Sequence, residues 1–351
     1  MRIIHTADLH LDSRLKTNLD SIKAKERKKE LQETFLHMVK YANDNDVNAI
    51  IIAGDMFDRP KIAIKTKEFV INTIKEYPQI DFIYISGNHD ENSFIDTLIE
   101  KPKNLITFSD SWKTLNYGDI DITAINYDLK MNKYIYDTLF LNENKFNIVC
   151  LHGALTKDEV DINRLKGKNI DYLALGHIHK YQKGTIDDRG IYIYPGCLEG
   201  RGFDEIGDKG FVLLDINNKK LESRFIKFAK RTIHEITVDI SGTDSWNEIK
   251  RNVNLKINSI SSDDMVRIKF VGNYDIELIK QNEILLDSLN DQFYFASILD
   301  ASKIAINPKD YENDISLKGE FIRGVLKSDL SDDEKNKVIE YGIKALMKEE
   351  I

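Results

Sequence analysis

The chain has 351 residues, enough for about two domains of ordinary size. Hydrophobic residues make up 42% and charged residues 31% of the sequence, which excludes a disordered chain of low hydrophobicity. Two cysteines exclude a disulfide framework, and the net charge of −8 argues against nucleic-acid binding unless the positive residues are clustered.

Short apolar runs alternate with longer amphipathic stretches in the first part of the chain. Arg2–His5, Ala49–Gly54 and Phe82–Gly87 are predicted strands, and residues 22–45 and 62–76 are predicted helices. This βαβαβ order indicates an α/β layer fold. The first strand begins without a signal-peptide pattern, and no apolar run approaches the ~20 residues that cross a bilayer. We therefore expect a cytoplasmic protein with no membrane partner.

Predicted strands follow one another more closely from about residue 105. Turn residues separate the candidates, which are 120–126, 146–151, 171–175, 190–194 and 210–216. We expect these strands to form a second sheet packed on the first. Together the two sheets would complete one domain over residues 1–232.

A different pattern begins after residue 232. Two alternating segments, 235–240 and 265–270, predict half-buried strands, and residues 244–253 and 274–289 predict helices. These elements indicate a small α+β domain over residues 233–312.

Residues 313–351 are predicted to form a helical tail. Ser331 and Glu334 have the spacing of a capping box in front of an apolar stripe. The stripe could pack on its own domain or bind a partner, and the sequence leaves both alternatives open.

Five short polar clusters each follow an apolar strand-like run. They are Asp8-Leu9-His10, Gly54-Asp55-Met56-Phe57-Asp58, Gly87-Asn88-His89-Asp90, His152-Gly153 and Gly176-His177-Ile178-His179. Open α/β sheets bind ligands at the carboxyl ends of their strands. A single Asp-x-His or Gly-Asp-x-x-Asp is more often a turn, but five clusters in this position indicate one shared site.

The side chains in these clusters are imidazoles, carboxylates and one carboxamide. This set suits divalent first-row metals, and the absence of cysteine ligands argues against a closed structural zinc site. The candidates are too many for one ion, whereas two ions roughly 3.5–4 Å apart that share a carboxylate would use them all.

The motif set resembles that of calcineurin-like metallophosphoesterases over roughly residues 1–215. Ile4–Leu11, Gly54–Pro60 and Tyr194–Gly196 are similar to SbcD-type DNA-repair nucleases, and Glu199–Phe203 with Gly207–Phe211 to their YhaO-like bacterial branch. The resemblance implies an α/β fold. Its parts would be a two-sheet α/β/β/α metallophosphoesterase sandwich, a small α+β capping domain and a helical C-terminal tail. Cys197 departs from the small polar residue of many relatives.

The resemblance also implies the ligands of each metal ion. One ion would be held by Asp8, His10 and His179, and the other by Asn88, His152 and His177. Asp55 would bridge the pair. A hydroxide that bridges the metals would attack phosphorus, since metal binding lowers the pKa of water from 15.7 to about 7. We expect Mn²⁺, with Fe²⁺, Zn²⁺ and Mg²⁺ as alternatives.

Two further residues are predicted to be catalytic. By resemblance, His89 would stabilise the transition state and protonate the leaving oxygen, and Asp58 would orient His89 through a hydrogen bond. The alternative for Asp58 is an N-cap of the helix at 62–76. Arg59, Lys61 and Arg201 are predicted to bind substrate phosphates, although a surface salt bridge is the alternative for Arg59.

These features predict a two-metal-dependent DNA exo/endonuclease subunit of a double-strand-break repair complex. By resemblance its partners would be an SbcC-type coiled-coil ATPase, bound by the tail, and a second copy of the chain in a homodimer. The alternative is a small-substrate phosphodiesterase or phosphomonoesterase, for example one acting on cyclic nucleotides, because the same metals serve both reactions. The segment from about Thr232 favours DNA, since a small-molecule enzyme needs no such cap. A scaffold with vestigial metals is disfavoured, because every ligand position is filled.

Overall fold

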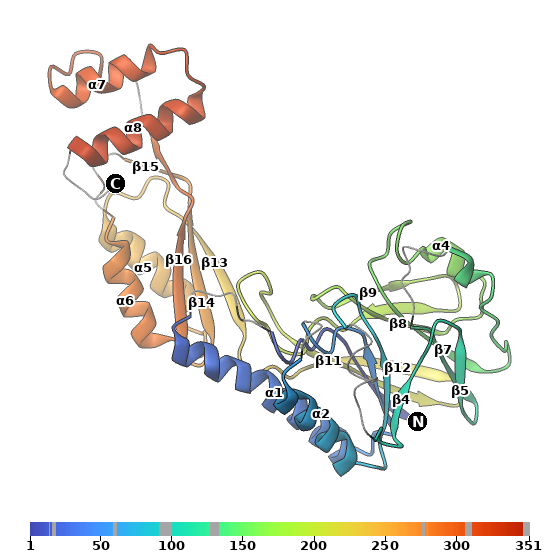
Figure 1. The fold of residues 1–351 in the computed structure, drawn as a ribbon. Helices are drawn as coiled ribbons and strands as arrows, with labels where there is room; N and C mark the ends of the chain where they lie inside the picture. Colours follow the sequence, from blue (N-terminus) through green and yellow to red (C-terminus); the bar gives the residue numbers. More distant parts are fainter. Residues whose placement is uncertain are drawn as a thin grey trace. The chain divides into compact units, whose positions relative to one another are not determined.

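A computed structural model describes residues 1–13, 15, 19–58, 62–90, 100–126, 133–275, 278, 280–305 and 311–346. The chain divides into two compact units, Met1–Ile233 and His234–Ile351 (Figure 1). In the described part of the chain, no helix is both long enough and apolar enough to span a membrane.

The first sheet of unit 1 has six strands in the order β12-β11-β1-β2-β3-β4. Strands β1 to β4 are mutually parallel, and β11 and β12 add to the edge in antiparallel fashion. The bounds are Arg2–Thr6 for β1, Ala49–Ala53 for β2, Asp81–Ile85 for β3, Leu105–Thr107 for β4, Gly210–Asn217 for β11 and Lys220–Lys227 for β12.

The second sheet also has six strands, in the order β5-β6-β7-β8-β10-β9. Its four central strands are parallel, and both edge strands are antiparallel to their neighbours. The bounds are Lys113–Tyr117 for β5, Ile120–Ala124 for β6, Phe146–His152 for β7, Tyr172–Gly176 for β8, Gln182–Thr185 for β9 and Ile191–Tyr194 for β10.

Strand β11 corrects the sequence prediction, which placed residues 210–216 in the second sheet. It pairs with β1 in the first sheet, with Leu214 opposite Ile3. The reason is that β11 is apolar on both faces. Phe211 faces the core on the helix side, whereas Val212 and Leu214 face the core between the sheets.

Three apolar layers hold unit 1 together. Helices α1 (Ser21–Asp44) and α2 (Ile64–Glu76) pack on the outer face of the first sheet through residues such as Phe35 and Val70. The two sheets bury a second core that includes Ile51 and Ile148. A third core covers the outer face of the second sheet with the segment η1 (Lys133–Tyr136) and the short helix α4 (Ile162–Leu165). The predicted α/β/β/α sandwich is therefore confirmed.

Unit 2 is a small α+β domain. Its main sheet has the order β13-β14-β16, and β15 pairs with β17. The strands are Ile233–Asp239 (β13), Met265–Val271 (β14), Asn273–Asp275 (β15), Phe295–Asp300 (β16) and Lys303–Ala305 (β17). The helices are Trp246–Ile257 (α5), Asn282–Gln292 (α6), Leu317–Leu326 (α7) and Asp332–Leu346 (α8). The helix expected from residue 274 begins only at Asn282, because residues 273–275 pair with β17.

The apolar stripe of the predicted tail is divided between the interior and the surface. Ile339 and Ile343 of α8, with Ile322 of α7, lie in the core of their own unit. Val338 and Tyr341 are exposed. Glu334 accepts a hydrogen bond from the backbone N–H of Ser331 at 2.9 Å, which is one half of the predicted capping box.

Candidate metal centre

The five polar clusters converge at one edge of unit 1. They follow β1, β2 and β3 of the first sheet and β7 and β8 of the second sheet, at the carboxyl ends of these parallel strands. Two hydrogen bonds join the sheets there. The backbone N–H of His177 donates to the carboxylate of Asp8 at 3.0 Å, and Nδ1 of His152 donates to the carbonyl of Ala53 at 2.8 Å.

Four non-glycine residues of these clusters have a left-handed backbone. Their φ angles are 53° at Asp8, 46° at His10, 51° at Asp55 and 100° at His177. Side chains disfavour this region, and each such residue costs on the order of 1–3 kcal/mol. These turns direct the four side chains into the space between the two sheets.

Two glycines are required by close packing at the same place. A Cβ atom on Gly54, whose φ is +92°, would collide with the ring of His152. A Cβ atom on Gly176 would collide with the carbonyl of Ala53, which accepts the His152 hydrogen bond. The glycines therefore allow the histidine ring to lie directly against both strands.

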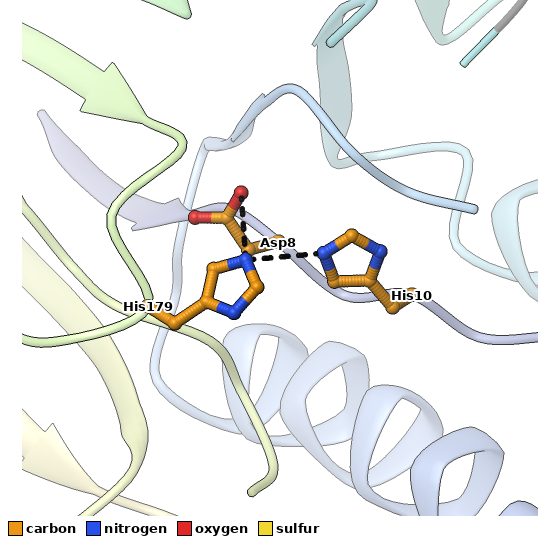
Figure 2. A group of neighbouring side chains, drawn as sticks. All are labelled: Asp8, His10 and His179. Carbon is orange, nitrogen blue, oxygen red and sulfur yellow. Dashed lines mark hydrogen bonds and ion pairs between the residues drawn. The ribbon is translucent and has the colours of Figure 1, made fainter. Parts of the chain in front are cut away.

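The first group of candidate ligands is Asp8, His10 and His179, which Figure 2 shows. One ligand atom from each lies within 4.8 Å of the others. Nε2 of His10 and Nε2 of His179 face each other at 3.3 Å, and Nε2 of His179 lies 3.9 Å from Oδ1 of Asp8. The spacing of the two nitrogens is close to the ~3.4 Å expected for two imidazoles on one tetrahedral ion.

The outer nitrogens of these two rings are held by carboxylates. Nδ1 of His179 lies 2.7 Å from Oε1 of Glu205, and Nδ1 of His10 lies 3.3 Å from Oδ1 of Asp58. A carboxylate can only accept, so Nδ1 of His179 is the donor to Glu205. Nδ1 of His10 lies at ion-pair distance from Asp58 without hydrogen-bond geometry, and the Nε2 atoms of both rings point inward. A proton or a metal ion has to sit between the two inward nitrogens, and metal binding releases such protons.

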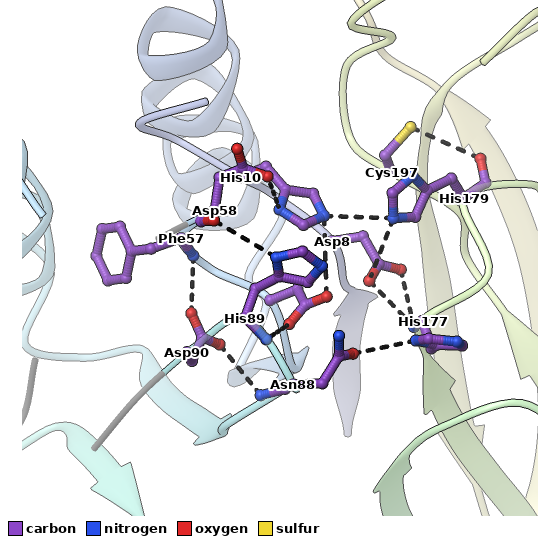
Figure 3. A network of polar contacts seen from close by, with 12 residues as sticks. Asp8, His10, Phe57, Asp58, Asn88, His89, Asp90, His177, His179 and Cys197 are labelled. Atoms are coloured by element: carbon purple, nitrogen blue, oxygen red, sulfur yellow. Dashed lines mark hydrogen bonds and ion pairs between the residues drawn. The ribbon is translucent and has the colours of Figure 1, made fainter. Parts of the chain in front are cut away.

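The second group is Asn88, His152 and His177, of which Figure 3 labels Asn88 and His177. Oδ1 of Asn88 lies 3.0 Å from Nε2 of His152 and 3.2 Å from Nδ1 of His177. Nδ1 of His152 is already used by the carbonyl of Ala53, so Nε2 is its inward nitrogen. Three potential ligand atoms thus meet at a second position.

Asp55 lies between the two groups, and Asp8 of the first group also approaches the second. Oδ2 of Asp55 is 3.5 Å from Nε2 of His152 and 3.9 Å from Nε2 of His10. Asp8 also approaches His152, because Asp8, Asp55 and His152 form a third set of donor atoms within 4.8 Å of one another. Either aspartate has the position of a bridging ligand, and the predicted bridge through Asp55 stays a prediction.

The electrostatics of the centre fit bound cations. Burial raises the pKa of Asp8 to about 6. Burial would lower the pKa of His152, but Asp55 and Asp8 raise it to about 9. Without metal, the two carboxylates therefore retain a proton on His152, whereas burial lowers the pKa of His10 and His177. The donor set of imidazoles, carboxylates and a carboxamide is the one that divalent first-row metals prefer, so the residues present fit two such ions.

The structure changes the predicted role of Asp58. Its carboxylate faces His10, and Oδ1 also accepts a hydrogen bond from Arg201 at 3.1 Å. Nδ1 of His89 instead lies 3.4 Å from the main-chain carbonyl of Asp58. The alternative of an N-cap is wrong as well, because Ala63 occupies that position of α2.

His89 lies at the exposed side of the centre. Its backbone N–H donates to Oδ1 of Asp55 at 3.0 Å, and its ring is 5.3 Å from the ring of His10. An exposed imidazole beside both groups is placed to reach a bound phosphoester. Its catalytic role remains a prediction.

Arg201 does not have the surroundings of a free phosphate-binding cation. Its guanidinium donates to Oε1 of Glu205 at 2.7 and 3.0 Å and to Oδ1 of Asp58 at 3.1 Å. Two carboxylates therefore balance its charge. The other predicted substrate-binding residues, Arg59 and Lys61, lie outside the described residues.

Sequence reasoning missed one carboxylate that organises the centre, Glu205, and gave no role to a second, Asp90, which it had named only as part of a polar cluster. Glu205 holds His179, and the only sequence signal for it is its place four residues after Arg201. Asp90 accepts hydrogen bonds from the backbone N–H groups of Met56 and Phe57 at 3.0 and 2.9 Å, and so joins two of the polar clusters.

The family model described as calcineurin-like phosphoesterase matches residues 1–181. An uncharacterized metallophosphoesterase of Bacillus subtilis, YhaO, is 29% identical over 266 residues, which cover 69% of this chain and 64% of that protein. The DNA double-strand break repair protein Mre11 of Saccharolobus solfataricus is 26% identical over 241 residues, which cover 62% of this chain and 61% of that protein.

The chain thus matches less than two thirds of the length of these relatives. A solved structure of a dimetal phosphatase from Danio rerio superimposes with a TM-score of 0.44 at 9% identity. That superposition covers 65% of this chain and 99% of the phosphatase.

Proposed function

Because the chain belongs to the calcineurin-like phosphoesterase family, as the match over residues 1–181 shows, we propose that it hydrolyses phosphodiester bonds in DNA with two divalent metal ions. The observation that carries the proposal is the meeting of two groups of ligand-type side chains around Asp55 and Asp8. The relatives named as DNA double-strand break repair proteins support DNA as the substrate.

The residues that would hold the metals fall into two sets. Asp8, His10 and His179 would hold one ion. Asn88, His152 and His177 would hold the other, with Asp55 between them. When bound, the ions supply a nucleophile at neutral pH and neutralise charge that develops on the phosphate. We propose Mn²⁺ as the ion.

The protein's own groups would carry the remaining steps. His89, exposed beside the centre, would hold a proton and deliver it to the leaving oxygen of the DNA sugar. The hydrogen bond from its backbone to Asp55 fixes its distance from the ligands. The carboxylates of Asp58 and Glu205 orient the rings of His10 and His179, so that these ligands need no rearrangement during the reaction.

A direct assay separates DNA cleavage from the alternative. The protein is loaded with Mn²⁺ and incubated with end-labelled linear DNA and, separately, with a cyclic nucleotide. We expect metal-dependent cleavage of the DNA. Rapid hydrolysis of the cyclic nucleotide with intact DNA would instead establish a small-substrate phosphodiesterase.

We further propose that the protein works in a DNA double-strand-break repair complex with a coiled-coil ATPase of the SbcC type and as a homodimer. The exposed side chains of Val338 and Tyr341 on α8 support a protein partner. Affinity capture from the native host tests the ATPase, and recovery of no such ATPase would reject it. Light scattering tests the dimer, and a monomer at high concentration would reject that part.

A further inference from the structure

The guanidinium of Arg201 bonds to two carboxylates, and each carboxylate lies against one candidate metal ligand. The carboxylate of Glu205 touches Nδ1 of His179, the carboxylate of Asp58 faces Nδ1 of His10, and Arg201 lies between them. His10 and His179 are the two imidazoles of the first ligand group. We propose that Glu205 and Arg201 are positioning residues for that metal site, which they serve by fixing the orientation of its two histidines. The inference rests on the proposed two-metal function.

Nδ1 of His179 is approached by the carboxylate of Glu205 and, at 3.2 Å, by Nη2 of Arg201. Oε1 of Glu205 is 2.7 Å from Nδ1, and the same oxygen accepts Nη2 of Arg201 at 2.7 Å and Nε at 3.0 Å. Oε2 of Glu205 accepts the backbone N–H of Arg201 at 2.7 Å. Both carboxylate oxygens are therefore occupied, and the Glu205 side chain has a single orientation.

The backbone of His179 is held from the same segment. Nζ of Lys209, a lysine that is only 3% exposed, donates to the carbonyl of His179 at 2.7 Å. Ring and main chain of His179 are thus fixed by two residues of the stretch 201–209. That arrangement leaves Nε2 directed at His10 and Asp8.

Arg201 also helps to fix the orientation of the His10 ring, through Asp58. Its Nη1 donates to Oδ1 of Asp58 at 3.1 Å, and this oxygen is the one that faces Nδ1 of His10 at 3.3 Å. A carboxylate behind a ligating imidazole fixes its tautomer and raises its basicity, and loss of such a partner typically lowers metal affinity 10–100-fold. The second ligand group has a different partner, since His152 uses the carbonyl of Ala53. Removal of Glu205 should therefore affect one metal ion and spare the other.

The test is a titration of metal-free protein with Mn²⁺, with free Mn²⁺ followed by electron paramagnetic resonance. The wild type should bind two equivalents. Glu205→Ala should bind one equivalent as the wild type does and the other 10–100-fold more weakly. Glu205→Gln keeps an acceptor oxygen but loses the charge, so its loss should be smaller. Arg201→Gln should weaken the same equivalent. Asp204→Asn, an exposed acid in the same segment, should titrate like the wild type.

The outcomes separate this inference from the proposed function. If Glu205→Ala and Glu205→Gln titrate like the wild type, the positioning role is wrong. If both equivalents weaken together and the melting temperature of the metal-free variants falls, Glu205 only supports the fold, and the inference is again overturned. If the wild type itself binds no second Mn²⁺, the two-metal function fails, and with it the need for such a role.

Discussion

His89 differs from three of the four candidate ligand histidines in what holds its ring. Nδ1 of His10, His152 and His179 each faces an oxygen atom at 2.7 to 3.3 Å, which fixes the ring. His89 is exposed, and its Nδ1 has a longer 3.4 Å contact with the carbonyl of Asp58. Ligands need fixed rings, whereas a proton donor has to follow the leaving group.

The His89→Ala variant tests this division of roles. We expect kcat on linear DNA to fall by about 10²–10⁴-fold, the usual contribution of a general acid, while two Mn²⁺ ions remain bound. Metal content and kcat are measured on the same preparation. His37→Ala, which removes an exposed histidine of α1, is the matched control and should keep full activity. Loss of metal from His89→Ala would show that His89 is a ligand instead.

The meeting of β2, β7 and β8 gives the centre its rigidity. Gly176 ends β8 directly against the carbonyl of Ala53 at the end of β2, and His152 at the end of β7 bonds to that carbonyl. The carbonyl oxygen of Ala53 in β2 is therefore in contact with both β7 and β8 of the other sheet. Small changes there alter both the packing of the sheets and the position of a ligand.

A glycine substitution tests the contact between the strands. Gly176→Ala should destabilise the protein by about 1–3 kcal/mol, because an added methyl group overpacks the strand ends. It should also weaken Mn²⁺ binding through displacement of His152. Gly324→Ala in α7 has open space for the methyl group and should leave stability unchanged or raise it slightly. Equal urea midpoints for the two variants would contradict the packing argument.

The elements that carry the centre were predictable because each has a local signal. Strands β1, β2, β3, β7 and β8 are apolar runs that end in polar clusters, and parallel strands bring such ends together. Pairing between distant segments has no comparable signal. Strand β11 is apolar on both faces, so its pattern does not say which sheet it joins. Glu205 lies 26 residues from His179, and only the fold brings their side chains together.

Local charge patterns were the least reliable guide. Arg27 lies in the basic run Lys23–Lys29, a pattern that is usual for a solvated helix face, but its side chain is buried. Helical periodicity explains this result, because Arg27 and Glu30 share the face that also holds Leu31 and Thr34. A charged residue on a buried face requires a partner, and the sequence does not identify a partner that is distant along the chain.

At the scale of the whole molecule, a buried charge network joins distant parts of unit 1. Arg231 Nη2 donates to Oε1 of Glu30 at 2.6 Å, and Arg27 bonds to both Glu30 and Glu199. Glu199 also accepts from Thr34 at 2.9 Å. Two arginines and two glutamates thus tie α1 to the segment that leads to Arg201 and to the end of the unit. Removal of one charge would leave the remaining buried charges with one counter-charge fewer.

The Glu30→Gln variant tests this network and its pH dependence. Burial opposes ionisation, but Arg231 and Arg27 lower the pKa of Glu30 to about 2. The stabilising effect of Glu30 is therefore present above the ordinary pKa of 4.5 and is lost as the pH falls toward 2. We expect Glu30→Gln to lose about 3–5 kcal/mol at pH 7, with a smaller difference from the wild type at pH 3. Urea unfolding at both pH values measures this, and a difference independent of pH would contradict it.

The two-metal centre itself is tested most directly by anomalous X-ray diffraction from crystals soaked in Mn²⁺. We predict two anomalous peaks roughly 3.5–4 Å apart. One should lie among Asp8, His10 and His179 and the other among Asn88, His152 and His177, with Asp55 between them. A single peak, or none within reach of these side chains, would contradict the account.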